Sequence, residues 1–373
     1  MKEINIAKVL VGKRKEKGIT QDEFANYIGV SKASVSKWET GQSYPDITFL
    51  PQIAAYFNIS IDDLMDYKPQ MPKGDIRRLY HTMSGAFAAE PFEEVMHRCR
   101  EIIKKYFACF PLLLKMGLLI LNHHTFSEDT GKRAASLLEA RELFIRVKQE
   151  SGDAELVKQA QYLEACCSMA LGDPQKVLEL LEITNAPLLP AETLLASAYQ
   201  ATGKIEDAKI TLQVGIYQHI VSLSGLFPAY LMLCENEPES FEEILRRGLA
   251  IAEAFDLKRL HPIVFINLYL SAAHGYITQG NKEKALNMLQ QYAQTAAGSI
   301  YPLELHGDGF FNRMDAWFAG LDLGAAPQHD EKAIRQGMYD SVVNNPDFAS
   351  IAEDYRFKRV AEKLKSNCQD AAI

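Results

Sequence analysis

The segment from Thr20 to Gly41 has residue types and spacings suited to non-covalent recognition rather than to covalent chemistry. It predicts two short helices around a tight turn. Thr20 and Glu23 have capping-box spacing, in which each side chain bonds the other residue's backbone N–H. Gly29 tolerates the left-handed backbone of a sharp turn, and Ser31 is a second N-cap candidate.

The apolar residues of this segment indicate which side of each helix is buried. Phe24, Ala25 and Ile28 give the first helix one apolar face at helical spacing. Val35 and Trp38 lie three residues apart in the second helix and are expected to face inward. The polar side of the second helix is then turned outward.

The segment resembles the Cro/C1-type (XRE) helix-turn-helix of phage repressors. That family's pattern, T-Q-x-x-[LF]-A-x-x-x-G-V-S-x-x-x-[VI]-S-x-W-E-x-G, is met at each specified position from Thr20 to Gly41. The resemblance covers about residues 3 to 66, with an amphipathic helix, Ile6 to Lys17, before the motif and apolar positions suited to a fourth and a fifth helix after it.

The resemblance implies which residues contact double-stranded DNA. Gln21 begins the first helix of the motif, where its amide and the helix N-terminus would meet a backbone phosphate. On the outward face of the second helix, lysine can donate to guanine O6 or N7 and an alanine methyl can touch a thymine methyl. Ser43 and Tyr44 would lie near the sugar-phosphate chain. The DNA-binding set comprises Gln21, Ser31, Lys32, Ala33, Ser36, Lys37, Ser43 and Tyr44.

Other charged residues of this region have a structural alternative. Arg14 and Glu39 match a pair that in the family forms an ion pair between helices one and three, so we expect them to be structural. Lys13, Lys15 and Lys17 form a charge run for which phosphate contact and simple solvation are equally good interpretations.

The charge balance predicts modest affinity for a single copy of this domain. Through Lys68 it has nine Lys/Arg and nine Asp/Glu, whereas up to Tyr44 there are eight basic and five acidic residues. Non-specific DNA binding depends on phosphate neutralisation. We therefore expect a need for dimerisation, which doubles the contacts and sets the half-site spacing.

The composition indicates a multidomain protein with real cores. The chain has 373 residues and 47% hydrophobic content, enough for two or more domains. Its net charge of −8 lies outside the first 68 residues, so the remainder suits sensing or protein contacts rather than nucleic acid. The six cysteines form no C-x-x-C pair. The adjacent Cys166 and Cys167 favour helical core over redox sensing.

We expect a soluble, cytoplasmic protein without a membrane partner. Met1 leads directly into a charged helix rather than a signal peptide. The longest apolar run, near Leu112 to Leu121, is broken by Lys115 and is too short to span a bilayer.

From about residue 84 onward the sequence predicts helix almost throughout, with a repeat anchored on Gly172, Gly203 and Gly280. Small residues precede each glycine by seven positions and leucines follow it by nine: Ala165, Ala196, Ala273, and Leu181, Leu212, Leu289. In this pattern the glycine ends one helix and the leucine packs the next helix back against it. The pattern resembles the tetratricopeptide repeat (TPR), whose period is about 34 residues; Gly172 and Gly203 are 31 apart.

The predicted fold class is all-α: a five-helix Cro/C1-type domain followed by a right-handed, TPR-like solenoid of helical hairpins. We expect a DNA-binding domain at 1–67, a linker and connecting helix at 68–83, and the repeat domain at 84–373. Within the middle segment the connecting helix is expected at 75–83. A degenerate repeat is expected around Phe227 to Phe255, divergent hairpins over Pro91 to Leu121 and around 137–147, and a C-terminal cap or dimer element after Tyr301.

The concave side of such a solenoid usually binds peptides. Asparagine suits that role because its amide can pair with both N–H and C=O of an extended peptide. The alternative is that these polar residues are simply solvated. The groove candidates are Thr193, Ser197, Gln200, Asn267 and His274.

Covalent chemistry has no positive signal in this sequence. His123 and His124 are adjacent, and neighbours on a helix point about 100° apart, so a shared metal is disfavoured. His306 and Asp308 have no accompanying nucleophile motif. Walker, G-x-S-x-G and dinucleotide motifs are absent. We therefore predict no enzyme activity, no cofactor and no metal.

The layout as a whole resembles the peptide-sensing regulators of the Rgg/PlcR/PrgX type. The resemblance implies a homodimeric transcription regulator in which a short peptide, held by the repeats, shifts the spacing of the two DNA-binding domains. The alternative is a scaffold whose repeats dock a larger protein partner while the helix-turn-helix serves as a tether.

Overall fold

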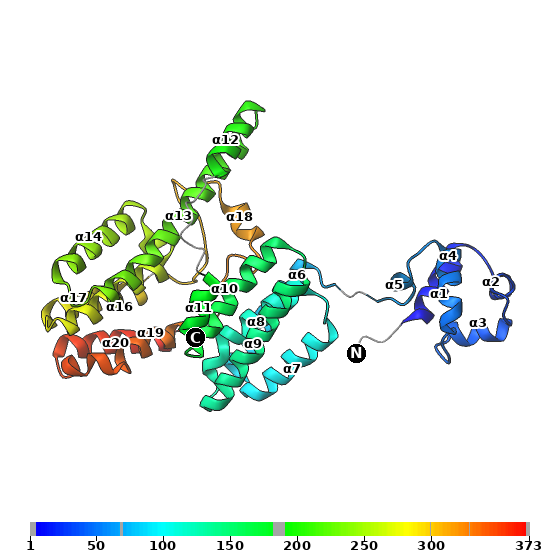
Figure 1. The fold of residues 1–373 in the computed structure, drawn as a ribbon, viewed down its shortest axis with the longest axis horizontal. Helices are drawn as coiled ribbons and strands as arrows, with labels where there is room; N and C mark the ends of the chain where they lie inside the picture. Colours follow the sequence, from blue (N-terminus) through cyan, green and yellow to red (C-terminus); the bar gives the residue numbers. More distant parts are fainter. Residues whose placement is uncertain (1–4, 68–69, 182–190, 299, 328, 371–373) are drawn as a thin grey trace. The chain divides into compact units, whose positions relative to one another are not determined.

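The computed structural model describes residues 5–67, 70–181, 191–298, 300–327 and 329–370 (Figure 1). Within these ranges every regular element is an α-helix or a 3-10 helix, which confirms the all-α prediction. The chain forms two compact units, Met1–Leu79 with Glu90–Glu182 and Tyr80–Ala89 with Ile183–Ile373. Part of the predicted linker, residues 68–69, lies outside the described residues, and the boundary there stays a prediction.

The first unit begins with the five helices that the sequence predicts. They are α1 (Ile6–Glu16), α2 (Gln21–Ile28), α3 (Lys32–Glu39), α4 (Leu50–Phe57) and α5 (Ile61–Leu64), with the 3-10 turn η1 (Ile47–Phe49) before α4. Leu10, Phe24, Val35, Ile53 and Leu64 form the centre of their core and are fully buried. One residue from each helix thus meets in a single apolar cluster, which fixes α2 and α3 relative to each other.

Longer helices follow in the first unit. They are α7 (Phe92–Lys105), α8 (Phe110–His123), α9 (Thr130–Glu150), α10 (Ala154–Ala170) and α11 (Pro174–Leu181), with η2 (His124–Phe126) after α8. Each of α8, α9 and α10 packs against the next helix along the chain. Gly117 permits the close approach of α8 to α9, because a Cβ there would lie 2.7 Å from the Phe144 ring. The predicted connecting helix over 75–83 falls within α6 (Lys73–Ala89).

The second unit contains the remaining hairpins and a C-terminal cap. Its elements are α12 (Ala191–Ala201), α13 (Ile205–Leu233), α14 (Pro238–Ala254), α15 (Leu257–Leu260), α16 (Pro262–Thr278), α17 (Lys282–Ala296), α18 (Asp315–Gly320), α19 (Glu331–Val343), η4 (Pro346–Ile351) and α20 (Tyr355–Asp370). Met338 of α19 and Phe357 and Leu364 of α20 join the core that covers α17. The predicted cap after Tyr301 is thereby confirmed, and its role in a dimer stays a prediction.

The three anchor glycines end helices as the repeat pattern predicts. Gly172, Gly203 and Gly280 have φ values of +78°, +78° and +72°. After each glycine the next backbone N–H bonds a carbonyl five residues back, at 2.8–2.9 Å: Asp173 to Ser168, Lys204 to Tyr199 and Asn281 to Tyr276. This is the Schellman arrangement, which satisfies carbonyls left open at a helix end.

One expected packing contact is wrong. The small residues Ala165, Ala196 and Ala273 are buried as predicted, and so is Leu289. Leu212 is instead 40% exposed: α13 approaches α12 closely at Gly215, against Glu192, and Leu212, one turn before Gly215, is only partly covered by this contact.

Helix α13 is longer than the repeat pattern suggests. It runs unbroken for 29 residues and contains Pro228, and its C-terminal half with α14 forms the degenerate hairpin predicted around Phe227 to Phe255. Of the described helices it is the one that is long and apolar enough to cross a membrane by length and composition, and it packs against α12, α14 and α16.

Two motifs with possible chemistry have ordinary structural roles. The six cysteines are free thiols. Burial raises the pKa of Cys166, and that of Cys167 to about 12, which suppresses the reactive thiolate. His123 is buried with Nδ1 2.8 Å from the Leu119 carbonyl, and Asp308 accepts hydrogen bonds from the backbone of the turn that follows it.

Candidate nucleic-acid interface

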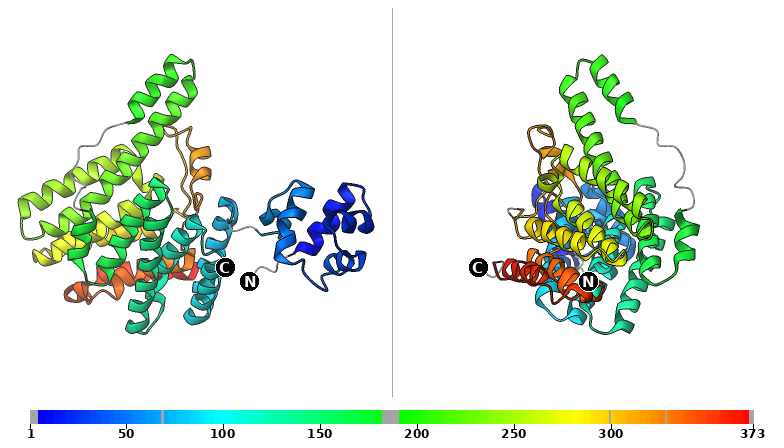
Figure 2. Two further views of the ribbon diagram at one scale, coloured as in Figure 1. Left: turned by 45° about the vertical axis from the view of Figure 1, so that its right-hand side comes forward. Right: turned by 90° about the vertical axis from the view of Figure 1, so that its left-hand side faces the viewer.

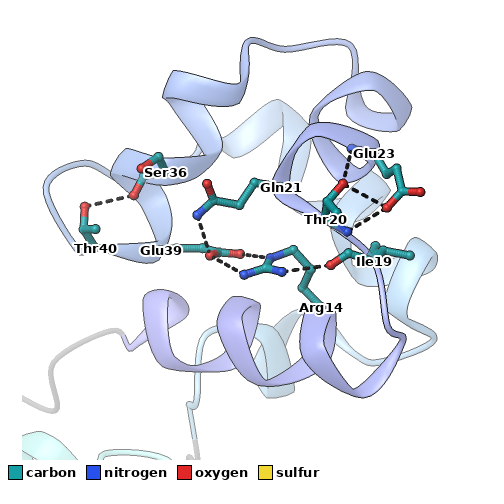
Figure 3. Close-up of polar contacts among 8 residues, drawn as sticks. All are labelled: Arg14, Ile19, Thr20, Gln21, Glu23, Ser36, Glu39 and Thr40. Carbon is teal, nitrogen blue, oxygen red and sulfur yellow. Dashed lines mark hydrogen bonds and ion pairs between the residues drawn. The ribbon is translucent and has the colours of Figure 1, made fainter.

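Two capped helix starts position the candidate site, and Figure 3 shows the first of them, at Thr20 and Glu23. At α2 the capping box is complete: the Glu23 backbone N–H donates to Thr20 Oγ1 at 3.2 Å, and the Thr20 N–H donates to Glu23 Oε2 at 2.7 Å. The Thr20 backbone N–H and the Thr20 hydroxyl both donate to the Glu23 carboxylate, and these two bonds hold its pKa below the usual value. At α3 the Ser34 N–H donates to Ser31 Oγ at 3.1 Å. Gly29 joins the two helices with φ +83°, so both caps and the turn follow from local sequence.

An ion pair fixes α1 against α3. Arg14 donates from Nε to Glu39 Oε1 at 2.5 Å and from Nη2 to Oε2 at 3.0 Å, and its Nη1 donates to the Ile19 carbonyl at 2.8 Å (Figure 3). Burial raises the pKa of the Glu39 carboxyl, but the hydrogen bonds from Arg14 and Gln21 outweigh it and the net pKa is lowered. The predicted structural role of this pair is confirmed.

The outward side of α3 is open. Lys32, Ala33 and Lys37 are exposed, whereas Val35 and Trp38 on the opposite side are buried at 0% and 6% exposure. Lys32 and Ser36 lie four residues apart, as do Ala33 and Lys37, and residues at this spacing are neighbours on a helix surface. Ala33 and Ser36, three residues apart, join the two pairs into one continuous surface. This surface combines two positive charges, a methyl and a hydroxyl, which is the chemistry that groove recognition uses.

The remaining DNA-binding candidates differ in how far their side chains are exposed. Ser31 and Tyr44 are exposed, and Ser43 is partly buried. Gln21 is also partly buried, and its Nε2 donates to Glu39 Oε2 at 2.9 Å. An amide nitrogen carries two hydrogens, so this bond leaves one for a phosphate while fixing the orientation of the side chain.

Two of the three lysines in the charge run interact with other residues of the domain. Lys13 pairs with Glu16 at 2.8 Å, and Lys17 donates to the Tyr56 carbonyl at 2.7 Å with its ammonium 3.7 Å from the centre of the Tyr56 ring. Lys15 is exposed and forms no ion pair with a described residue. It is therefore the member of the run best placed for a phosphate contact.

Two exposed polar residues beyond α3 were missed by the sequence interpretation. Thr40, whose Oγ1 donates to the Ser36 carbonyl at 2.9 Å, and Gln42 lie directly after the helix end. Residues beyond a helix end belong to no periodic pattern, and the family motif leaves both positions unspecified.

The groove candidates fall on two separate helices. Thr193, Ser197 and Gln200 lie exposed on α12, and Ser197 Oγ donates to the Thr193 carbonyl at 2.8 Å. Asn267 and His274 lie on α16, and α12 and α16 each pack against α13. His274 lies between two carboxylates, with Nε2 3.0 Å from Asp347 and Nδ1 3.6 Å from Glu235.

Comparison with known proteins agrees with this geometry at the N-terminus. Residues 13–64 match a family model described as helix-turn-helix. The HTH-type transcriptional activator BcrR of Enterococcus faecalis is 38% identical over 52 residues, which are 14% of this chain and 26% of that protein. The match thus spans about a quarter of the length of this curated relative.

Solved structures with low similarity extend over more of the chain. PlcR of Bacillus thuringiensis, in complex with the peptide PapR7 and DNA, is 12% identical, covers 78% of this chain and 94% of its own, and has a TM-score of 0.29. The apo form of ComR from S. Thermophilus is 14% identical over 79% of this chain and 94% of its own, with a TM-score of 0.25. Such TM-scores are too low to support an argument about this chain.

The capped helices, the αL turn and the open face of α3 define an N-terminal helix-turn-helix domain. Within that class the N-terminal domain belongs to the Cro/C1 (XRE) type, on its family match over residues 13–64 and on its motif from Thr20 to Gly41.

Proposed function

We propose that this chain is a sequence-specific DNA-binding transcription regulator, and that α3 is the helix that enters the major groove. The observation that carries the proposal is the contrast between the two sides of α3: Lys32 and Lys37 are exposed while Val35 and Trp38 are buried. The Arg14–Glu39 pair and the two caps fix the position of this face in the free protein. Binding to DNA therefore loses little conformational entropy. The domain at residues 1–67 supplies the contacts and the remaining residues regulate them.

The regulator acts as a homodimer in the cytoplasm. Through Lys68 the net charge is zero, because Asp46, Asp62, Asp63 and Asp66 offset Lys68 and the surplus of three positive charges up to Tyr44, so phosphate neutralisation by one copy is weak. Two copies double the contacts and read two half-sites at a defined spacing. A palindromic operator is the expected target.

The helical hairpins of residues 84–373 sense a short peptide or another small ligand. The candidate contacts are the exposed polar residues of α12 together with the exposed Asn267 and the partly buried His274 of α16. Each set lies on the first helix of a hairpin, and that helix ends at a Schellman glycine. A ligand changes DNA binding only if it prefers one arrangement of the dimer over another.

Mapping of bound genomic sites followed by footprinting tests the proposal. We expect protection of a palindrome and an affinity that falls with salt, because counterions are released on binding. Purified protein that ignores every duplex at low salt would refute DNA recognition. Sensing is tested on the same operator with synthetic peptides from the secreted set of the host. If no peptide alters either affinity or half-site spacing, peptide sensing is refuted and DNA binding stands.

A further inference from the structure

Helix α13 carries a stripe of exposed side chains along its whole outer side. The stripe consists of Leu212, Ile216, His219, Leu223, Leu226, Tyr230 and Leu233, whose spacings alternate between four and three residues. Its six apolar members are between 38% and 82% exposed, and the His219 side chain is 55% exposed. We refer to these seven residues as the α13 stripe.

The α13 stripe is not the core side of the helix. Ala208, Tyr217, Ile220 and Leu231 lie on other positions of α13 and are buried, and three of them belong to the apolar clusters of the second unit. Figures 1 and 2 show the α12–α13 hairpin extending beyond the other helices of this unit. A surface helix normally turns its polar residues outward, whereas α13 turns leucines outward on this side.

The stripe also lacks the charges that keep a surface helix solvated. From Ile210 to Cys234 the chain contains no Asp, Glu, Lys or Arg. Exposed apolar patches of about 300–600 Å² on a monomer commonly mark interaction sites. Six side chains at these exposures amount to a patch on the order of 500 Å². Two such patches brought together remove about 1,000 Å² from water, which is the lower bound for a biological protein interface.

The spacing of the stripe identifies its occupant. Alternation of four and three residues gives a period of 3.5, which is the period of two helices packed side by side. The stripe is also complementary to a second copy of itself that runs in the opposite direction. In an antiparallel pair Leu223 meets Leu223 on the two-fold axis, Ile216 meets Tyr230 and Leu212 meets Leu233. Each contact then joins two apolar side chains, with His219 against Leu226 as the single exception.

We propose that two copies of this chain associate through the α13 stripe, with their α13 helices antiparallel. The contact is isologous, because the same surface is used by both copies and a two-fold axis closes the assembly. At 1.5 Å rise per residue the paired segment is about 32 Å long. The inference rests on the homodimer of the proposed function, for which it names the surface, and it needs no DNA for its test.

Sedimentation equilibrium of the full chain over a range of concentrations tests the proposal. Leu223→Glu places two carboxylates opposite each other on the axis and is expected to raise the dimer dissociation constant at least tenfold. Leu138→Glu is the matched control, because Leu138 on α9 is 42% exposed and Leu223 is 43% exposed. Leu233→Glu, at an 82% exposed position, is a second disrupting variant that is safe for the fold. Circular dichroism melts verify that each variant is folded.

The orientation of the pair is tested by cysteine cross-linking under mild oxidation, against the wild-type background of six native cysteines. Leu212→Cys and Leu233→Cys chains are expected to cross-link to each other in a mixture and not to themselves. Self-cross-linking of either variant would overturn the antiparallel arrangement.

Three outcomes would overturn the proposal in distinguishable ways. A wild-type chain that stays monomeric at all concentrations refutes both the stripe contact and the homodimer. A dimer that Leu223→Glu leaves intact refutes the stripe and leaves the homodimer standing. A monomeric wild type that floats with neutral phospholipid vesicles, and loses this property in Leu223→Glu, identifies a membrane as the occupant instead. DNA binding by the monomeric variant is measured separately and bears only on the helix-turn-helix.

Discussion

Arg14 and Glu39 face each other across α1 and α3 with two hydrogen bonds, and the glutamate side chain is only 4% exposed while the arginine is 15% exposed. Gln21 of α2 donates to the same carboxylate. One carboxyl group therefore ties together three helices, and the position of α3 depends on it.

Replacement of Glu39 by Gln is expected to destabilise the helix-turn-helix by about 3 kcal/mol, because it leaves the mostly buried Arg14 charge without its carboxylate partner. The effect is measured as the free energy of unfolding in urea, from Trp38 fluorescence in a Trp317→Phe background, since the chain has two tryptophans. Glu16→Gln removes an exposed charge from the Lys13–Glu16 pair and should change stability by well under 1 kcal/mol. Equal effects of the two variants would contradict a structural role for Glu39.

The same pair makes stability depend on pH. Because the folded-state pKa of Glu39 lies below the ordinary value of 4.5, its contribution is complete above pH 4.5 and is lost as the pH falls through the lower, folded-state pKa. Acid unfolding followed by Trp38 fluorescence should therefore be shallower in Glu39→Gln than in the wild type below pH 4.5. Parallel acid curves for the two proteins would show that other carboxylates govern this transition.

Gly29 and Gly12 provide a matched pair of alanine substitutions with opposite expected signs. A Cβ would meet nothing within 4 Å at either position, but Gly29 has φ +83° and Gly12 lies inside α1. Gly29→Ala should cost about 1–2 kcal/mol through left-handed backbone strain. Gly12→Ala should stabilise by about 0.5–1 kcal/mol through helix propensity. The two unfolding free energies are compared in urea; a neutral Gly29→Ala would contradict the αL turn.

The local features of the N-terminal domain were predictable because each depends on residues close in sequence. The capping box at Thr20, the turn at Gly29 and the buried Trp38 all follow from spacing alone. The bond from Gln21 to Glu39 was not predictable, since it depends on how closely α2 approaches α3. Sequence reasoning assigned Gln21 to phosphate only, and the structure gives its amide a second partner within the protein.

The second unit shows where periodicity fails as a guide. The repeat period predicts shorter helices than α13, and the helix continues through Pro228 although proline inside a helix removes a hydrogen bond and favours a break. Leu212 was expected to pack inward because the repeat pattern places a leucine nine residues after each glycine; Leu289 is buried as that pattern predicts, and Leu212 is not. A period of 3.5 in the sequence identifies the stripe, and the exposure of its side chains shows that the second unit itself leaves the stripe uncovered.

Gly275 should tolerate no side chain, because a Cβ there would lie 2.3 Å from Cε2 of the buried Phe241. Gly275→Ala is expected to cost about 1–3 kcal/mol by overpacking between α14 and α16. Gly337→Ala on α19 is the control, since its Cβ would meet nothing within 4 Å. Thermal melting of the full chain should show a lowered midpoint for Gly275→Ala alone, and equal midpoints would show that Phe241 can move aside.

Lys37→Ala and Gln21→Ala should separate base reading from phosphate contact. Lys37 projects from the exposed side of α3, so its loss should weaken binding to the operator by about 1–3 kcal/mol and relax discrimination at one or two base pairs. Gln21→Ala should weaken binding to all sequences alike, because phosphates carry no sequence information. The measurement is fluorescence anisotropy against the footprinted operator and its single-base variants at fixed salt. Lys158→Ala removes an exposed charge from α10 and serves as the control for net charge. If Lys37→Ala keeps both affinity and sequence preference, α3 does not face the bases in the proposed orientation.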